Sequence, residues 1–159
     1  MERLLALCAF SVASTLALNT TRAGHRTTAG VQQTEIESVG ADVVQSTMDW
    51  AAALPFDGVA TAVTAAELTL PAGFGSGASW QAVADLDDCH NKTTVVAVAG
   101  PSGTLAYTLS ARVEYVAKVG TQWQVSALRT TAKQLTLQMS GPRYPRPVVV
   151  SRVYTLAGI

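Results

Sequence analysis

The chain has 159 residues, of which 48% are hydrophobic and 14% are charged, and its formal net charge is zero. That length suits about one domain with a modest core, and the composition excludes an intrinsically disordered chain. The charges are segregated, with ten acids and three bases in residues 1–90 and eight bases and one acid in residues 91–159. Such polarity could orient neighbouring molecules head to tail or present a basic face to an anion, although two solvated surfaces with a chance bias explain it equally well.

An apolar run from Leu4 to Leu18 contains no charge, and Glu2 stands at its edge. Three interpretations are open: a cleavable signal peptide with a site near Ser14, a membrane span, or the start of a longer helix. A span needs ~20 apolar residues, and this run supplies fifteen. The longer helix is favoured because the first proline is Pro55.

The second half of this predicted helix is amphipathic. Glycines and threonines make the middle of the helix its weakest stretch, and the chain turns at "LPFDG" because Pro55 disfavours helix at the residue before it. The helical spacing then predicts one buried stripe against a core. The stripe consists of Ile36, Val39, Val43, Thr47, Trp50 and Leu54.

Residues 55–92 lack a sustained period and read as a connecting region with a Gly-rich surface loop, "PAGFGSGASW". From residue 93 the apolar period becomes two, which predicts four antiparallel strands in 93–159. One face of the second strand would bury Leu105, Tyr107, Leu109, Val113, Tyr115 and Val119, and a later strand Leu135, Leu137 and Met139. The predicted fold class is α+β: a long N-terminal helix, apolar over 1–24 and amphipathic over 25–54, packed on a four-stranded antiparallel sheet.

Three stretches carry a resemblance to a known family. The opening "MERLLALCAFSV" resembles the segment after the cleavage site of type IV pilins and pseudopilins. The loop "ADLDDCHN" is similar to an Asp-rich loop of several minor pilins, and "TTAKQLTLQMSGPRYPRPVVVSRVYTL" resembles their closing hairpin, which rises from a Lys-containing strand. The family has a leader ending in glycine and a few residues before its glutamate, so we expect the chain to begin at an internal methionine.

The resemblance implies a structural subunit of a pilus-like filament or pseudopilus. The subunit would reside in the bacterial inner membrane before assembly and then in an extracellular or periplasmic filament, with other pilin subunits as partners. Glu2 would pair with the N-terminal amine of the neighbouring subunit, because an acid beside hydrocarbon needs a partner. The apolar segment would pack in the filament core, through Leu4, Leu5, Phe10, Val12 and Leu16.

Other candidate sites are weak. Asp85, Asp87 and Asp88 could hold Ca²⁺, but they lack the spacing of an EF-hand and are more typical of a solvated acidic loop. His25 and "CH" at 89–90 form no recognisable metal-ligand pattern. No nucleophile, phosphate-loop or dinucleotide motif occurs, so neither an enzyme nor a cofactor is predicted.

A basic segment near the end of the chain is the best candidate for contact with an anion or DNA. It contains Arg143, Tyr144, Arg146 and Arg152. A stiff, solvated hairpin tip at "PRYPRP" is the favoured interpretation, so nucleic acid is not expected to be the main partner. The alternative to a filament subunit is a secreted or membrane-anchored β-rich binding module, whose N-terminal segment serves only as a signal or anchor. A cleaved signal has no reason to continue into an amphipathic helix, so the filament subunit is favoured.

Overall fold

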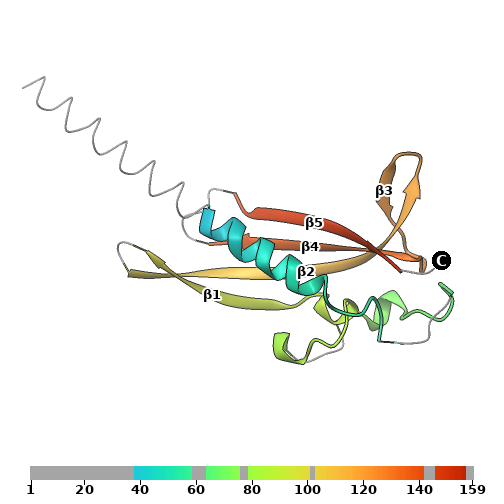
Figure 1. Cartoon of the computed structure of the whole chain (residues 1–159), viewed down its shortest axis with the longest axis horizontal. Coiled ribbons are helices and arrows are strands. Elements are labelled where there is room, and N and C mark those ends of the chain that lie inside the picture. Colours follow the sequence, from blue (N-terminus) through green and yellow to red (C-terminus); the bar gives the residue numbers. More distant parts are fainter. Residues whose placement is uncertain (1–37, 59–63, 76–78, 101–102, 142–145, 157–159) are drawn as a thin grey trace, which may run out of the picture. The chain divides into compact units, whose positions relative to one another are not determined.

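The computed structural model describes residues 38–58, 64–75, 79–100, 103–141 and 146–156. Residues 39–159 form one compact unit, in which an antiparallel sheet carries a helix across one face (Figure 1). The helix covers residues 38–51. The other elements are η1 (Pro71–Gly73), η2 (Trp80–Ala82), η3 (Asp87–Cys89), β1 (Thr93–Gly100), β2 (Gly103–Val119), β3 (Gln122–Val125), β4 (Ala132–Ser140) and β5 (Val148–Thr155).

The expected fold class is corrected on two counts. In the described part of the chain the helix is short and ends at residue 51, so the prediction of a long N-terminal helix is wrong, while residues 1–37 lie outside the described residues. The last turn tightens, with Ala53 N–H donating to Trp50 O and Leu54 N–H to Ala51 O. Such i to i−3 bonds end a helix before Pro55, which disfavours helix at its predecessor.

The second correction concerns the sheet, which has five strands among the described residues rather than the four expected. The sequence interpretation joined β3 and β4 into one strand. A two-residue turn at Gly120 (φ 63°) instead folds β3 back on the end of β2, and the chain then loops before β4 begins. Glycine adopts this left-handed conformation without steric cost.

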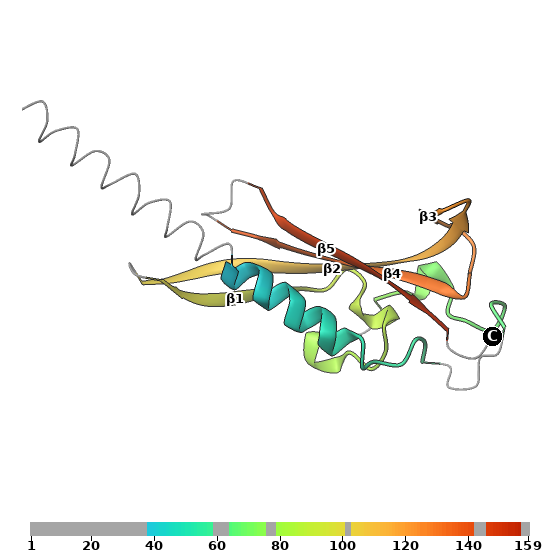
Figure 2. The same ribbon diagram turned by 45° about the horizontal axis from the view of Figure 1, so that its top comes forward.

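The helix packs on the sheet through a different stripe from the expected one. Val44, Met48 and Ala51 are fully or almost fully buried, whereas Val39 and Trp50 of the predicted stripe are 39% and 42% exposed. Figure 2 shows the helix lying along the sheet face. The physical reason is close approach: the small Gly40 and Ala51 on the buried side let the helix sit nearer to the strands than a stripe with Trp at its centre allows.

The principal strand order is β1-β2-β4-β5, with β3 paired to the end of β2, and all pairs are antiparallel. The strand β2 is the long central element, and β1 and β4, which flank it, pair with different parts of its length. β1 pairs with β2 from Gly103 to Ser110, whereas β4 pairs with it from Thr108 to Tyr115. The hairpin of β1 and β2 therefore projects beyond β4 as a two-stranded arm, and the edge strands β1 and β5 are offset along the strand direction.

The period of two along β2 is confirmed over most of the strand. Its buried positions on that face are Tyr107, Leu109, Ala111, Val113 and Tyr115, and the middle three pair with Met139, Leu137 and Leu135 of β4. Val116 is also buried and breaks the alternation. The prediction that Val119 is buried is wrong, because its side chain is 54% exposed. It lies where β2 pairs with β3 alone, beyond the part of the sheet that the helix covers.

Candidate partner-binding site

A buried lysine organises one end of the sheet. The Lys133 side chain is fully buried on β4, and its Nζ donates to Phe56 O at 2.8 Å and to Asp57 Oδ2 at 2.9 Å. The same Nζ lies 2.5 Å from Asp87 Oδ1. Three aromatic rings surround the charge, with centroids 4.4 to 5.4 Å from Nζ, and they belong to Phe56, Phe74 and Tyr115. A buried ammonium is tolerated here because carboxylates and ring faces replace its water.

The two carboxylates of this cluster differ in their hydrogen bonding. Asp57 also accepts from Thr69 N–H at 3.0 Å and from Thr69 Oγ1 at 2.9 Å. Asp87 Oδ2 has no hydrogen-bond donor among the described residues. Burial raises the pKa of Asp87 from 3.8 to about 7, Lys133 lowers it and the charge of Asp57 raises it. Asp57 is therefore the better-satisfied partner of Lys133, and Asp87 titrates near neutral pH.

The cluster fastens the connecting region to the sheet. Asp57 and Asp87 come from opposite ends of that region, and Lys133 joins both to β4. The Tyr115 hydroxyl also donates to Thr69 O at 2.7 Å, and Arg129 donates to Leu68 O at 3.0 Å. Because these contacts are long-range, they hold a segment with little secondary structure against β2 and β4.

The Asp-rich loop uses its acids internally. Asp87 points to Lys133, whereas Asp85 accepts from Asp88 N–H and Asp88 accepts from Ala84 N–H, each at 3.0 Å. No group of three or more His, Cys, Asp or Glu side chains is arranged to hold a metal ion in the described parts of the chain. The sequence favoured a solvated acidic loop over a calcium site, but Asp85 and Asp87 are buried, and the three aspartates form a turn and an ion pair.

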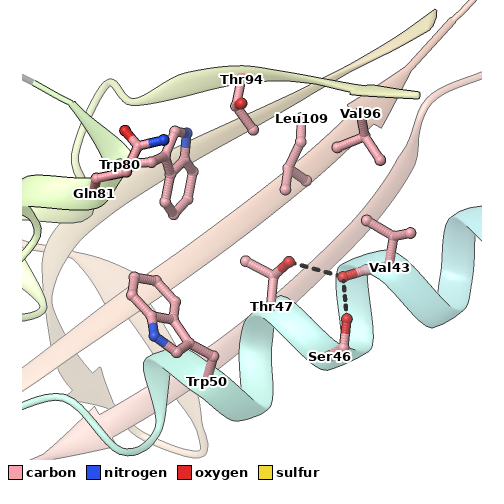
Figure 3. A pocket seen from close by; sticks show the side chains of 9 residues that line it. All are labelled: Val43, Ser46, Thr47, Trp50, Trp80, Gln81, Thr94, Val96 and Leu109. Carbon is pink, nitrogen blue, oxygen red and sulfur yellow. Dashed lines mark hydrogen bonds between the residues drawn. The ribbon is translucent and has the colours of Figure 1, made fainter.

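An apolar groove lies between the helix and β1 on the same face of the sheet (Figure 3). Its volume is about 440 Å³. The rings of Trp50 and Trp80 stand 5.9 Å apart at 55° and flank one end of it. The remaining lining comes from Val43, Ser46, Thr47, Gln81, Thr94, Val96 and Leu109.

The predicted helix stripe explains why the groove is apolar. Val43, Thr47 and Trp50 were expected to face the core, but they line the groove instead. Trp50 remains 42% exposed there, and the Trp80 indole N–H, although buried, has no acceptor among the described residues. A stripe of this size left beside the core, rather than in it, is typical of a surface that a partner covers.

The remaining predicted site residues do not come together in the described structure. The assembly residues (Glu2, Leu4, Leu5, Phe10, Val12 and Leu16) lie outside the described residues, as do Arg143 and Tyr144. Arg146 is exposed. Arg152 donates to Asp49 on the helix at 3.2 Å, so its charge is already paired.

Sequence reasoning missed the Lys133 cluster as a site. Lys133 stands in an alternating strand, "AKQLTLQMS", in phase with the buried Leu135 and Leu137, and Asp57 sits in the turn after the helix. A lysine beside an apolar strand pattern was a usable signal, since buried lysines require acidic partners. The partners themselves lie 76 and 46 positions away in the chain and carry no local pattern.

Comparison with family models, with curated proteins and with solved structures finds no match to this chain. The helix in the described residues does not have the length and apolarity needed to cross a membrane.

Proposed function

We propose that this chain is a structural subunit of a pilus-like filament or pseudopilus. It would be held in the inner membrane before assembly and would join the filament through its apolar N-terminal segment, with the sheet unit on the outside. Glu2 would set the position of each subunit by pairing with the N-terminal amine of its neighbour. Other copies of this chain, or other subunits of the same filament, are its partners.

The attachment of helix 38–51 to the sheet is the observation that carries the proposal. In the sequence this helix follows the segment that holds the apolar run. Val44 and Met48 are fully buried, and the Tyr154 hydroxyl donates to Met48 O at 3.1 Å. A firm joint of this kind suits a subunit whose N-terminal segment carries load, whereas a discarded signal needs no such joint.

A secreted or membrane-anchored binding module is the second candidate, and the open groove beside β1 favours it. A groove between a helix and an edge strand can receive an extended peptide. In that case the N-terminal segment would be only a signal or anchor, and partners would differ from this chain.

The N-terminal peptide of the protein in membrane and sheared surface fractions separates the two candidates. A filament subunit retains residues 4–18 in the sheared fraction, and mass spectrometry would detect that peptide. A terminus at Ser14 or beyond would show that the apolar run is removed, and it would contradict the filament proposal.

A substitution at Glu2 tests the assembly role directly. Glu2→Ala should leave the sheet unit folded but prevent filament formation, because the apolar segment would lose the charge that aligns it. Glu67→Ala is a matched control, since Glu67 is an exposed acid of the sheet unit whose carboxylate accepts bonds from the neighbouring Thr64. Normal filaments from Glu2→Ala, seen by electron microscopy of sheared material, would refute the role.

A further inference from the structure

Within the described residues, the edge strand β1 shows none of the features that keep sheet edges from pairing with other chains. Natural edges are protected by lysine, proline, bulges or a covering segment. β1 has the sequence "TTVVAVAG", and its eight residues pair one to one with β2 without a bulge. The whole stretch 93–111 carries no charge, and Val95 is 68% exposed. In the described structure β1 is an end strand of the sheet.

The groove lies directly beside this edge. Thr94 and Val96 of β1 form one wall, and Val43 and Trp50 of the helix form the other (Figure 3). A strand added to β1 would therefore bond its backbone to the edge and place alternate side chains in the apolar groove. The partner must be a polypeptide strand rather than a lipid surface, because hydrocarbon cannot satisfy the outward N–H and C=O groups of β1.

The other edge of the same sheet fits these requirements. β5 also has eight residues and pairs one to one with β4, and its exposed Val149 is 53% accessible. Its charged residue, Arg152, pairs with Asp49 on the helix. We infer that the β1 edge and its groove receive β5 of a second copy of this chain, so that the sheets of successive copies join edge to edge.

The strand directions and faces agree with this pairing. Each step from β1 through β2 and β4 to β5 is antiparallel, so β5 of a second copy in the same orientation runs antiparallel to β1. Full overlap of the two strands places Ala97 opposite Ser151. Both are exposed. Opposite residues of an antiparallel pair share one face, and this register keeps the apolar groove on the helix side of both sheets.

The offset between the edges sets the step from one copy to the next. Ala97 pairs with Ala106 of β2, whereas Ser151 pairs with Thr136 of β4, which pairs with Arg112 of β2. The centres of the two edges are therefore six residues apart along β2, roughly 20 Å at ~3.3 Å per residue. Contacts between two different edges are head to tail, so they produce an open chain of subunits unless the rotation between copies closes a ring. The inference rests on the proposed function in one respect: in the proposed filament, this strand pairing would be the lateral contact between subunits.

A charge placed on the edge tests the pairing. Val95→Lys puts a solvated ammonium where the second copy must bind, and it should reduce assembled protein roughly tenfold or more, which corresponds to ~1.4 kcal/mol. Val149→Lys should do the same from the other edge. Val125→Lys is the matched control, because Val125 is 63% exposed but belongs to β3, away from both edges. Thermal unfolding of each full-length variant in detergent checks that the fold is kept.

Cysteine cross-linking tests the register in the full chain. All cross-linking variants are made in a Cys8→Ala background, so that Cys89 is the remaining native cysteine. Cys89 is buried and burial raises its pKa to about 12, so it reacts slowly. Ala97→Cys combined with Ser151→Cys should give a ladder of disulfide-linked multimers after mild oxidation, and each single variant should give none. Within one copy the two positions are separated by three strand spacings, at least ~14 Å, which is too far for a disulfide.

The outcomes separate this inference from the proposed function. A ladder in the membrane fraction without any sheared filaments would support the strand pairing and remove the filament proposal. Dimers from Ala97→Cys alone would show that two β1 edges pair with each other, and they would overturn the inference. Filaments that persist in Val95→Lys, or that form without cross-links in the double variant, would overturn it while leaving the filament proposal intact.

Discussion

The two ends of β2 have opposite chemistry. Near Tyr115 the sheet buries Lys133 with Asp57 and Asp87 under aromatic rings, and the connecting region is fastened over it. Near Gly103 the arm of β1 and β2 carries no charge, and β1 is an open edge in the described structure. Charges usually lie outside and apolar strands inside, and here both rules are reversed. The first end is thus completed by contacts within the chain, whereas the second is the end at which we propose that a partner binds.

The end of β2 near Tyr115, called the closed end below, should lose stability when Lys133 is replaced. Lys133→Met leaves Asp57 and Asp87 buried without a cation, and it should lower the free energy of unfolding by ~3–5 kcal/mol. Urea denaturation of the full-length protein at pH 7 measures this loss. Lys118→Met is the control, since Lys118 is exposed and its removal should cost less than ~0.5 kcal/mol. Equal effects of the two substitutions would contradict the structural role of the cluster.

The junction between the arm and the rest of the sheet depends on a close contact. A Cβ at Gly141, just after β4, would overlap the buried Tyr107 ring. Gly141→Ala should therefore destabilise the protein by ~1–3 kcal/mol. A smaller side chain in Tyr107→Leu should relieve part of this cost, so a double-mutant cycle should show coupling between the two positions. Additive effects would mean that the contact does not limit the packing.

The pH dependence of stability should report the raised pKa of Asp87 at the closed end. The pKa of Asp87 is raised from 3.8 to about 7, chiefly by burial, in surroundings that include Lys133, Asp57 and Tyr115. Between these values the folded state holds more protons than the unfolded state, so this group makes the free energy of unfolding fall as pH rises. Wild type should lose stability relative to Asp87→Asn over that interval, as urea midpoints would show. Parallel profiles for the two proteins would exclude the shift.

The smallest effect is expected at the surface ion pair on the helix. Arg152 and Asp49 are 3.2 Å apart, but their side chains are 40% and 59% exposed. Water screens such a pair, so Arg152→Gln should change the free energy of unfolding by less than ~1 kcal/mol. A loss of stability as large as that of Lys133→Met would show that burial does not determine how much an ion pair contributes to the stability of this protein.

The sequence predicted the strands better than it predicted the helix. Alternation predicted the buried face of β2 from Tyr107 to Tyr115, because a period of two is visible within a single strand whose one face is covered by the rest of the protein. It could not place the offset of β1 and β4 on β2, which depends on pairing between distant segments. Hydrophobicity and helical spacing alone place the stripe with Trp50 in the core, whereas close packing selects Val44 and Met48 and leaves Trp50 in the groove.

The site was even less accessible to sequence reasoning. The Asp-rich loop favours a solvated acidic loop over a Ca²⁺ site when only its own residues are read, because the lysine that Asp87 meets is 46 residues away in the chain. The groove joins a helix, a 3₁₀ turn and two strands, and no single segment carries its pattern. Contacts of this kind are set by the fold, so they become visible only after the topology is known.

The staggered pairing of β2 has a mechanical consequence. A pull between β1 and β4 along the strands must pass through β2, where only Thr108, Leu109 and Ser110 pair with both neighbours. Tension in that direction loads the hydrogen bonds of each ladder together, in shear, rather than opening them one after another. The sheet should thus resist stretching along its strands far more than peeling at an edge, a useful property for any protein that bears force.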